Sequence, residues 1–108
     1  MPSAKDGGVD VAFRTRKLER CYREHRAGVR EFGAEAARRY IERINLIKSA
    51  RDLDELLFLP GLHGHPLKGD RAGQFAIRLT GSLRLTFTVP ENGATTVCIE
   101  EVSKHYED

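Results

Sequence analysis

The sequence predicts an α+β domain in which a small antiparallel β-sheet carries two N-terminal helices on one face. Apolar residues recur every three or four positions in the first half of the chain, which is typical of amphipathic helices, and alternate with polar residues from Phe75 onward, which is typical of strands. A length of 108 residues with 40% hydrophobic side chains allows one modest core. We therefore expect a single domain over residues 9–108, after a flexible leader of small and turn-forming residues at positions 1–8.

The helical half is expected to begin after a short alternating strand at residues 9–13. A helical apolar stripe follows, made of Leu18, Cys21, Tyr22 and His25. Gly28 and Gly33 are expected to interrupt the chain before a longer helix over residues 34–50. The two helices are expected to lie antiparallel and share a core face, and Asp52 is placed to cap one further turn.

Two alternating runs on either side of a turn at residues 81–82 are expected to form a hairpin. Pairing Phe75 with Phe87 puts every apolar residue of the first strand opposite an apolar residue of the second. This register sets Arg78 opposite Arg84. The hairpin therefore predicts two cationic side chains at one place on the sheet.

A third strand is expected over residues 95–102, after a turn at residues 90–93, and it carries Glu100. Because two arginines that face each other across a ladder repel, the predicted register requires an anion, a neighbouring carboxylate or solvent between them. A bound phosphate and Glu100 are both candidates for this role.

Charge is distributed unevenly along the chain. Residues 1–51 carry thirteen Lys/Arg and seven Asp/Glu, whereas residues 52–108 carry five and nine, so the net charges of the halves are +6 and −4. The basic helical half suggests docking to a polyanion, although charged helix faces are more often only solvated. Cys21 and Cys98 are isolated in the sequence and are expected to be reduced, packed thiols.

The composition argues against a membrane protein and against secretion. No run approaches the ~18 consecutive apolar residues that a membrane span needs. Residues 1–10 contain no apolar signal-peptide core. We therefore expect a cytoplasmic protein without membrane contact.

The most informative segment is residues 65–71, which read His-Pro-Leu-Lys-Gly-Asp-Arg and precede the strands that carry Arg78 and Arg84. An imidazole, an ammonium and guanidinium groups can hold a phosphodiester, stabilise its pentavalent transition state and move protons near neutral pH. The proline is expected to stiffen the loop so that His65 and Lys68 face the same side. The segment therefore predicts a site for RNA cleavage.

The cations of this segment are expected to differ in their roles. Lys68 offers a compact charge to one nonbridging oxygen, whereas Arg78 and Arg84 offer planar forks that can grip two oxygens together. Arg71 is a further candidate for contact with phosphate, with solvent or Asp70 as its alternative partner. For Arg78 the alternative is an ordinary exposed strand residue.

Two residues near the C-terminus are candidates for proton transfer. His105 would supply a second titrating group, and Tyr106 would donate a proton or stack on a base, although a terminal histidine is often only exposed. His63 and His65 form a His-x-His pair, but a metal site needs a third ligand nearby. We therefore expect no metal ion and no cofactor.

The order of a short strand, two helices, the residue 65–71 loop and the arginine-bearing hairpin resembles the HigB-type toxins of the RelE superfamily. The matching motifs are residues 65–71, Gln-Phe-Ala-Ile-Arg at 74–78, Arg-Leu-Thr-Phe at 84–87 and Glu-Val-Ser-Lys-His-Tyr at 101–106. The resemblance covers nearly the whole chain after the leader and implies a RelE-like fold. Phe75 stands where many relatives have tryptophan, and the chain ends differently from the relatives that close with an acidic residue, Tyr and His.

The resemblance implies a toxin of a type II toxin–antitoxin system that cuts mRNA in the ribosomal A site. It implies a HigA-like helix-turn-helix antitoxin as partner, and a toxin–antitoxin complex that binds operator DNA. His65, Lys68 and Arg84 match the family's loop histidine, loop lysine and sheet arginine. His105 and Tyr106 lie where the family ends in a His/Tyr pair, so these five residues are the expected catalytic group, with Arg71 and Arg78 binding substrate.

Two other functions are compatible with the same residues. A non-catalytic module that binds RNA or the ribosome would use the cations only to hold backbone phosphates. A toxin relative that acts on a protein target such as gyrase would share the fold without cutting RNA, because one small fold supports unrelated targets.

Overall fold

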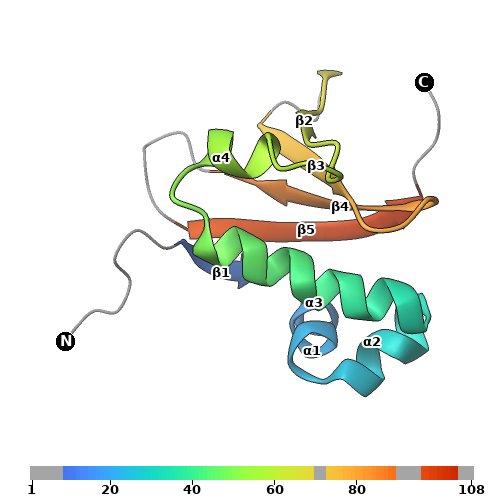
Figure 1. Ribbon diagram of the computed structural model, residues 1–108. Helices are drawn as coiled ribbons and strands as arrows, with labels where there is room; N and C mark the ends of the chain where they lie inside the picture. Colours follow the sequence, from blue (N-terminus) through green and yellow to red (C-terminus); the bar gives the residue numbers. More distant parts are fainter. Residues whose placement is uncertain (1–8, 70–72, 90–95, 105–108) are drawn as a thin grey trace.

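The computed structural model describes residues 9–69, 73–89 and 96–104 (Figure 1). Its elements, in chain order, are β1 (Asp10–Phe13), α1 (Arg16–Arg23), α2 (His25–Phe32), α3 (Ala34–Ser49), α4 (Leu53–Leu57), β2 (His65–Pro66), β3 (Gln74–Arg78), β4 (Leu83–Thr88) and β5 (Thr96–Lys104). The predicted leader at residues 1–8 and the predicted turn at residues 90–93 lie outside the described residues. None of the helices in the described part of the chain is long and apolar enough to cross a bilayer.

The five strands form one sheet in the order β1-β5-β4-β3-β2. The predicted α+β class is confirmed, and the sheet is mixed because β1 runs parallel to β5 while the other pairs are antiparallel. The predicted hairpin register is also confirmed, since Phe75 pairs with Phe87 and Arg78 pairs with Arg84. Along β4, alternate side chains therefore point to opposite faces of the sheet.

Three helices, not two, precede the α4 turn. The expectation that Gly28 breaks the chain is wrong, because this residue lies inside α2 and is buried. A Cβ added to Gly28 would meet the Cβ of Ala37 at 3.2 Å, so the glycine allows α2 to approach α3 closely. The chain breaks instead at Glu24, which has an extended backbone, and at Gly33, whose φ of 92° few other residues adopt. Asp52 caps α4 as predicted, accepting a hydrogen bond from the backbone N–H of Glu55.

The core lies between the sheet and α3, which runs along β1 and β5 with α1 and α2 on its other side (Figure 1). Fully buried side chains of α3 and of the strands build this core: Tyr40, Ile44, Ile47, Ile77, Leu85, Phe87 and Ile99. The Tyr40 hydroxyl donates a hydrogen bond to the carbonyl oxygen of Leu18 at 2.7 Å, so the polar end of this buried ring is satisfied. One face of the sheet is thus closed by helices.

Candidate functional site

The opposite face of the sheet carries a group of polar side chains, and we call it the distal face. Its residues follow from the strand register, because directly paired residues point to the same side. Around the hairpin the distal face consists of three cross-strand rows: Arg78, Arg84 and Ser103; His65, Ala76, Thr86 and Glu101; and Gln74, Thr88 and Cys98. Leu85 and Phe87 alternate with these residues along β4 and point into the core.

A hollow of ≈ 210 Å³ opens where β2 lies beside the end of β3 and the start of β4. Its lining residues are His63, His65, Ala76, Ile77, Arg78, Leu83 and Arg84. The structure therefore brings His65, Arg78 and Arg84, three of the residues expected from the sequence, to one concave place.

Backbone contacts fix the relative positions of the loop and the strands around this hollow. The backbone N–H of Arg78 donates to the carbonyl oxygen of Leu62 at 2.7 Å, and the Leu62 side chain is buried in the core. The backbone N–H of Leu67 donates to the Gln74 carbonyl oxygen at 2.9 Å on the far side of β2. These bonds hold the backbone of β2 beside the hairpin, and the Nδ1 of the His65 imidazole lies 3.1 Å from the carbonyl oxygen of Pro66.

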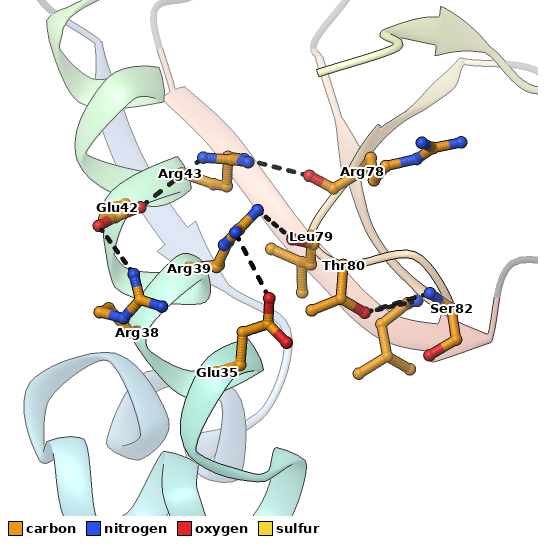
Figure 2. Close-up of polar contacts among 10 residues, drawn as sticks. Glu35, Arg38, Arg39, Glu42, Arg43, Arg78, Leu79, Thr80 and Ser82 are labelled. Atoms are coloured by element: carbon orange, nitrogen blue, oxygen red, sulfur yellow. Dashed lines mark hydrogen bonds and ion pairs between the residues drawn. The ribbon is translucent and has the colours of Figure 1, made fainter. Parts of the chain in front are cut away.

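Two arginines of α3 hold the end of β3 from the other side of the sheet (Figure 2). The Nε of Arg43 donates to the carbonyl oxygen of Arg78 at 3.1 Å, and an Nη of Arg39 donates to that of Leu79 at 3.4 Å. In Figure 2 the guanidinium group of Arg78 points away from α3. Burial, followed by the charge of Arg39, lowers the pKa of Arg43.

The sequence analysis missed Arg39 and Arg43. A signal was present, because they flank Tyr40 and Ile44 of the apolar stripe, and arginine at the edge of a buried stripe can reach over to backbone acceptors. Only the placement of α3 beneath the turn after β3 shows which carbonyl groups they reach.

Within the described part of the chain, the facing arginines of the hairpin, Arg78 and Arg84, are not ion-paired. The sequence-based alternative that Glu100 separates them is wrong, because Glu100 accepts hydrogen bonds from Arg14 at 3.2 Å and from Thr88 at 2.6 Å. An uncompensated pair of cations beside a hollow favours an anionic ligand.

Three polar side-chain atoms of the distal face are buried without a hydrogen-bond partner. They are Nε of Arg84, Oγ1 of Thr86 and Oγ of Ser103. Buried polar atoms are almost always paired in native proteins, and leaving one unpaired costs about 1–3 kcal/mol. Three such atoms on one part of the sheet therefore require an explanation.

The remaining expected site residues are placed differently. Lys68 is exposed and does not line the hollow. Arg71, His105 and Tyr106 lie outside the described residues. His63, considered in the sequence only as half of a metal-binding pair, lines the hollow and has a φ of 52°, a conformation uncommon for a side chain with a Cβ. Within the described ranges, no group of three or more His, Cys, Asp or Glu is placed to hold a metal ion.

Several solved structures share this architecture. A YoeB/ParE toxin from Agrobacterium tumefaciens matches with a TM-score of 0.57 and 24% identity, over 91% of this chain and 100% of that chain. A YoeB dimer from Staphylococcus aureus matches with a TM-score of 0.59 and 16% identity, over 91% and 98% of the two chains. The chain has the fold of these toxins. A YafQ variant from E. coli also matches, with a TM-score of 0.59 and 12% identity over 90% and 93%.

The likeness is one of structure. No protein-family model matches the sequence, and no curated protein matches it significantly. The RelE-like architecture expected from the sequence is confirmed by these neighbours. The HigB subtype is not distinguished by them and stays a prediction.

Proposed function

We propose that the chain is a toxin of a type II toxin–antitoxin system, of the HigB type within the RelE superfamily, that cuts mRNA on the translating ribosome. The observation that carries the proposal is the convergence of His65, Arg78 and Arg84 on one hollow of the distal face. The toxin fold of the chain supports the same function. Neither arginine forms an ion pair with a described residue, which leaves both guanidinium groups available to a phosphate.

The proposed reaction uses the message's own 2′-hydroxyl group as nucleophile. Its oxygen attacks the adjacent phosphorus, the bond from phosphorus to the 5′-oxygen breaks, and a 2′,3′-cyclic phosphate and a 5′-hydroxyl form. His65 or His105 removes the 2′-hydroxyl proton, and the other histidine or Tyr106 protonates the departing 5′-oxygen. This chemistry needs neither metal nor cofactor, because the arginines supply the positive charge.

The cations divide the work of holding the scissile phosphate. Arg84, with Arg78 or Arg71 assisting, grips two phosphate oxygens at once and stabilises the charge that develops on them in the transition state. Lys68 lies on the same loop as His65 and binds a further oxygen or the neighbouring phosphate.

The proposed partners are a HigA-like helix-turn-helix antitoxin, the ribosome with its message, and operator DNA through the toxin–antitoxin complex. A YoeB–YefM complex from Staphylococcus aureus, which matches with a TM-score of 0.56 and 19% identity, supports a protein partner for this fold. Co-expression with the helix-turn-helix protein of an adjacent reading frame should relieve growth arrest.

We propose that the ribosome is bound through the basic surface of α1 and α2. Arg20, Arg26 and Arg30 line a shallow hollow there, and of the three only Arg20 forms an ion pair with a described residue, Glu24. Because phosphate contacts release counterions, affinity should fall steeply with salt, and Arg26→Ala with Arg30→Ala should flatten that dependence. Ribosome binding that stays unchanged across a wide salt series would contradict this docking mode.

The reaction is tested by mapping new RNA ends in a translation reaction with wild-type protein, His65→Ala and Lys68→Ala. We expect ends within codons of translated messages for the wild type, with 2′,3′-cyclic or 3′-phosphate termini, and about 10²–10⁴-fold slower cleavage for His65→Ala. Arg38→Ala is the control, because this exposed residue lies on α3 away from the hollow. Translation arrest with intact message would identify a binding module, and toxicity without new RNA ends would identify a protein target.

A further inference from the structure

The three unpartnered atoms of the distal face lie next to one another in the ladder. Ser103 pairs directly with Arg84 across β4 and β5, and Thr86 follows Arg84 by two positions on the same face of β4. Directly paired residues have Cβ atoms about 5 Å apart, and a two-residue step along a strand spans about 7 Å. The long side chain of Arg84 can therefore reach either hydroxyl group.

These atoms are chemically complementary. The Nε–H of Arg84 is a donor, and the hydroxyl oxygens of Thr86 and Ser103 each accept as well as donate. They are nevertheless all buried and have no hydrogen-bond partner among the described residues. Their neighbouring positions in the ladder allow the Nε–H of Arg84 to donate to one of these hydroxyl groups once the arginine side chain turns.

Other hydroxyl groups of the chain show that this is a local feature. On the same strand and the same face, Thr88 donates to the carboxylate of Glu100 at 2.6 Å. Thr80 accepts hydrogen bonds from the backbone N–H groups of Ser82 and Leu83. Among the described residues, the buried side-chain atoms without partners are the three around Arg84 alone.

Solvent does not reach these atoms, so a ligand does not contact them directly in this arrangement. The guanidinium end of Arg84 is different, because this residue also lines the hollow beside Arg78. An anion in the hollow would pull the guanidinium toward it, against the repulsion of Arg78, and so reorient the buried Nε.

We propose that Thr86 and Ser103 are positioning residues that accept the Nε–H of Arg84 when its guanidinium group engages a phosphate. The hydroxyl groups then fix the plane of the fork, so that both Nη atoms address phosphate oxygens. In the free protein the orphaned atoms raise the energy of the site, and binding removes that cost. The inference rests on the proposed function for its substrate, an RNA phosphodiester, but the positioning itself requires only an oxyanion.

The test is an NMR titration of ¹⁵N-labelled full-length protein with inorganic phosphate, following the Nε–H signal of Arg84. Arg84→Lys assigns the signal by its loss. We expect phosphate to shift this signal and slow its exchange with solvent, and Thr86→Val and Ser103→Ala each to weaken phosphate binding about fivefold. Thr86→Ser, which keeps the hydroxyl group, should restore binding.

A double-mutant cycle separates positioning from a general structural effect. In the Arg84→Lys background Thr86→Val should change phosphate affinity by less than twofold, because no Nε–H remains to be positioned. Thr88→Val is the matched control: it removes a satisfied hydroxyl group from the same strand face and should lower stability without altering the phosphate response.

The stability of the free protein gives an independent readout. Because Thr86 Oγ1 has no partner, Thr86→Val should leave the unfolding midpoint unchanged or raise it, while weakening phosphate binding. Equal phosphate affinity in wild type and Thr86→Val, additive effects in the cycle, or no phosphate binding by the wild type would overturn the inference. Message cleavage is measured separately, and its absence with an intact cycle would overturn only the proposed nuclease function.

Discussion

The two faces of the central sheet differ in whether their polar side chains have hydrogen-bond partners. On the helix side the polar groups near the core are paired: the Tyr40 hydroxyl bonds to Leu18, and the Arg43 guanidinium bonds to the carbonyl group of Arg78. On the distal face, the buried Nε of Arg84 and Oγ1 of Thr86 have no hydrogen-bond partner among the described residues. Because the apolar face of β4 already secures the strand, its other face can carry groups that only a ligand satisfies.

The difference between the two faces is tested most directly by substituting adjacent residues of β4 that point to opposite faces. Phe87→Ala should lower the free energy of unfolding by about 3–5 kcal/mol, because the ring is fully buried and leaves a cavity. Thr86→Val, one position away, should cause no loss. Urea unfolding followed by circular dichroism measures both.

The control for this pair is Phe58→Ala. Phe58 follows α4 and is 83% exposed, so the same truncation should change stability by no more than about 0.5 kcal/mol. A large loss at Phe58, or a loss at Thr86 that matches the one at Phe87, would show that the two faces do not divide stability and ligand binding between them.

The second prediction concerns Arg84 on the distal face. Arg84→Ala should slow message cleavage about 10²–10³-fold, a cost of roughly 3–4 kcal/mol in the transition state, because a charged donor to the developing negative charge is lost. Stability should be kept or slightly raised, since the facing Arg78 is relieved of repulsion. Cleavage rates and unfolding midpoints are measured on the same preparations.

Arg84→Lys sharpens this result. The substitution keeps the charge but loses the two-pronged geometry, so an intermediate rate is expected. A rate equal to that of the wild type would mean that the positive charge alone, and not the fork, serves the reaction.

The sequence-based predictions succeeded where a local pattern determines the structure and failed where a tertiary contact determines it. The hairpin register was predictable because a slip by one residue would turn Phe75 and Phe87 away from the core. The predicted helix break at Gly28 was wrong. A glycine is needed at this position because Ala37 of α3 lies close to it, and no local pattern reveals such a tertiary contact. The parallel pairing of β1 with β5 is likewise invisible in the alternation of either strand.

The site was predictable as far as the register and the loop define it. His65 meets Arg78 and Arg84 because residues 65–66, predicted as part of a loop, form β2 and pair with the edge of the hairpin. The role of Ser103 could not be predicted, because it depends on which polar atoms fail to find a partner once all five strands are in place. Unpaired atoms are a property of the assembled sheet.

The third prediction tests whether the helix side supports the distal face. Arg43→Met keeps much of the apolar stem but removes the hydrogen bond from a charged group to the Arg78 carbonyl oxygen. We expect a stability loss of about 1.5–3 kcal/mol, and slower cleavage because the end of β3 is less firmly held. Arg38→Met, an exposed change on the same helix, should alter neither quantity.

The stability and cleavage rate of Arg43→Met distinguish two possible roles of α3. If stability falls and cleavage by the remaining folded protein is normal, α3 contributes to folding only. If cleavage falls further than the folded fraction explains, the bonds from α3 orient Arg78, whose guanidinium group points away from α3 in Figure 2, toward the hollow.

The smallest expected effect lies at Tyr40, deep on the helix side. Tyr40→Phe removes the hydrogen bond to the Leu18 carbonyl oxygen and should cost about 1 kcal/mol at neutral pH. Burial, followed by the charge of Cys21, raises the pKa of Tyr40 above its ordinary value of about 10. Because the hydroxyl group ionises more readily in the unfolded chain, the stability it contributes is complete below that pH and is lost as the pH rises above it.

Urea unfolding at pH 8 and at pH 10.5 should therefore show the wild type losing more stability than Tyr40→Phe over this interval, so that the two curves approach each other. Tyr22→Phe is the matched control for the loss of a tyrosine hydroxyl group as such, because the Tyr22 hydroxyl donates to Asn45 in an exposed setting. Parallel curves for wild type and Tyr40→Phe would mean that the Tyr40 ring is hydrated, and that the helix side of the sheet is less completely closed than its packing indicates.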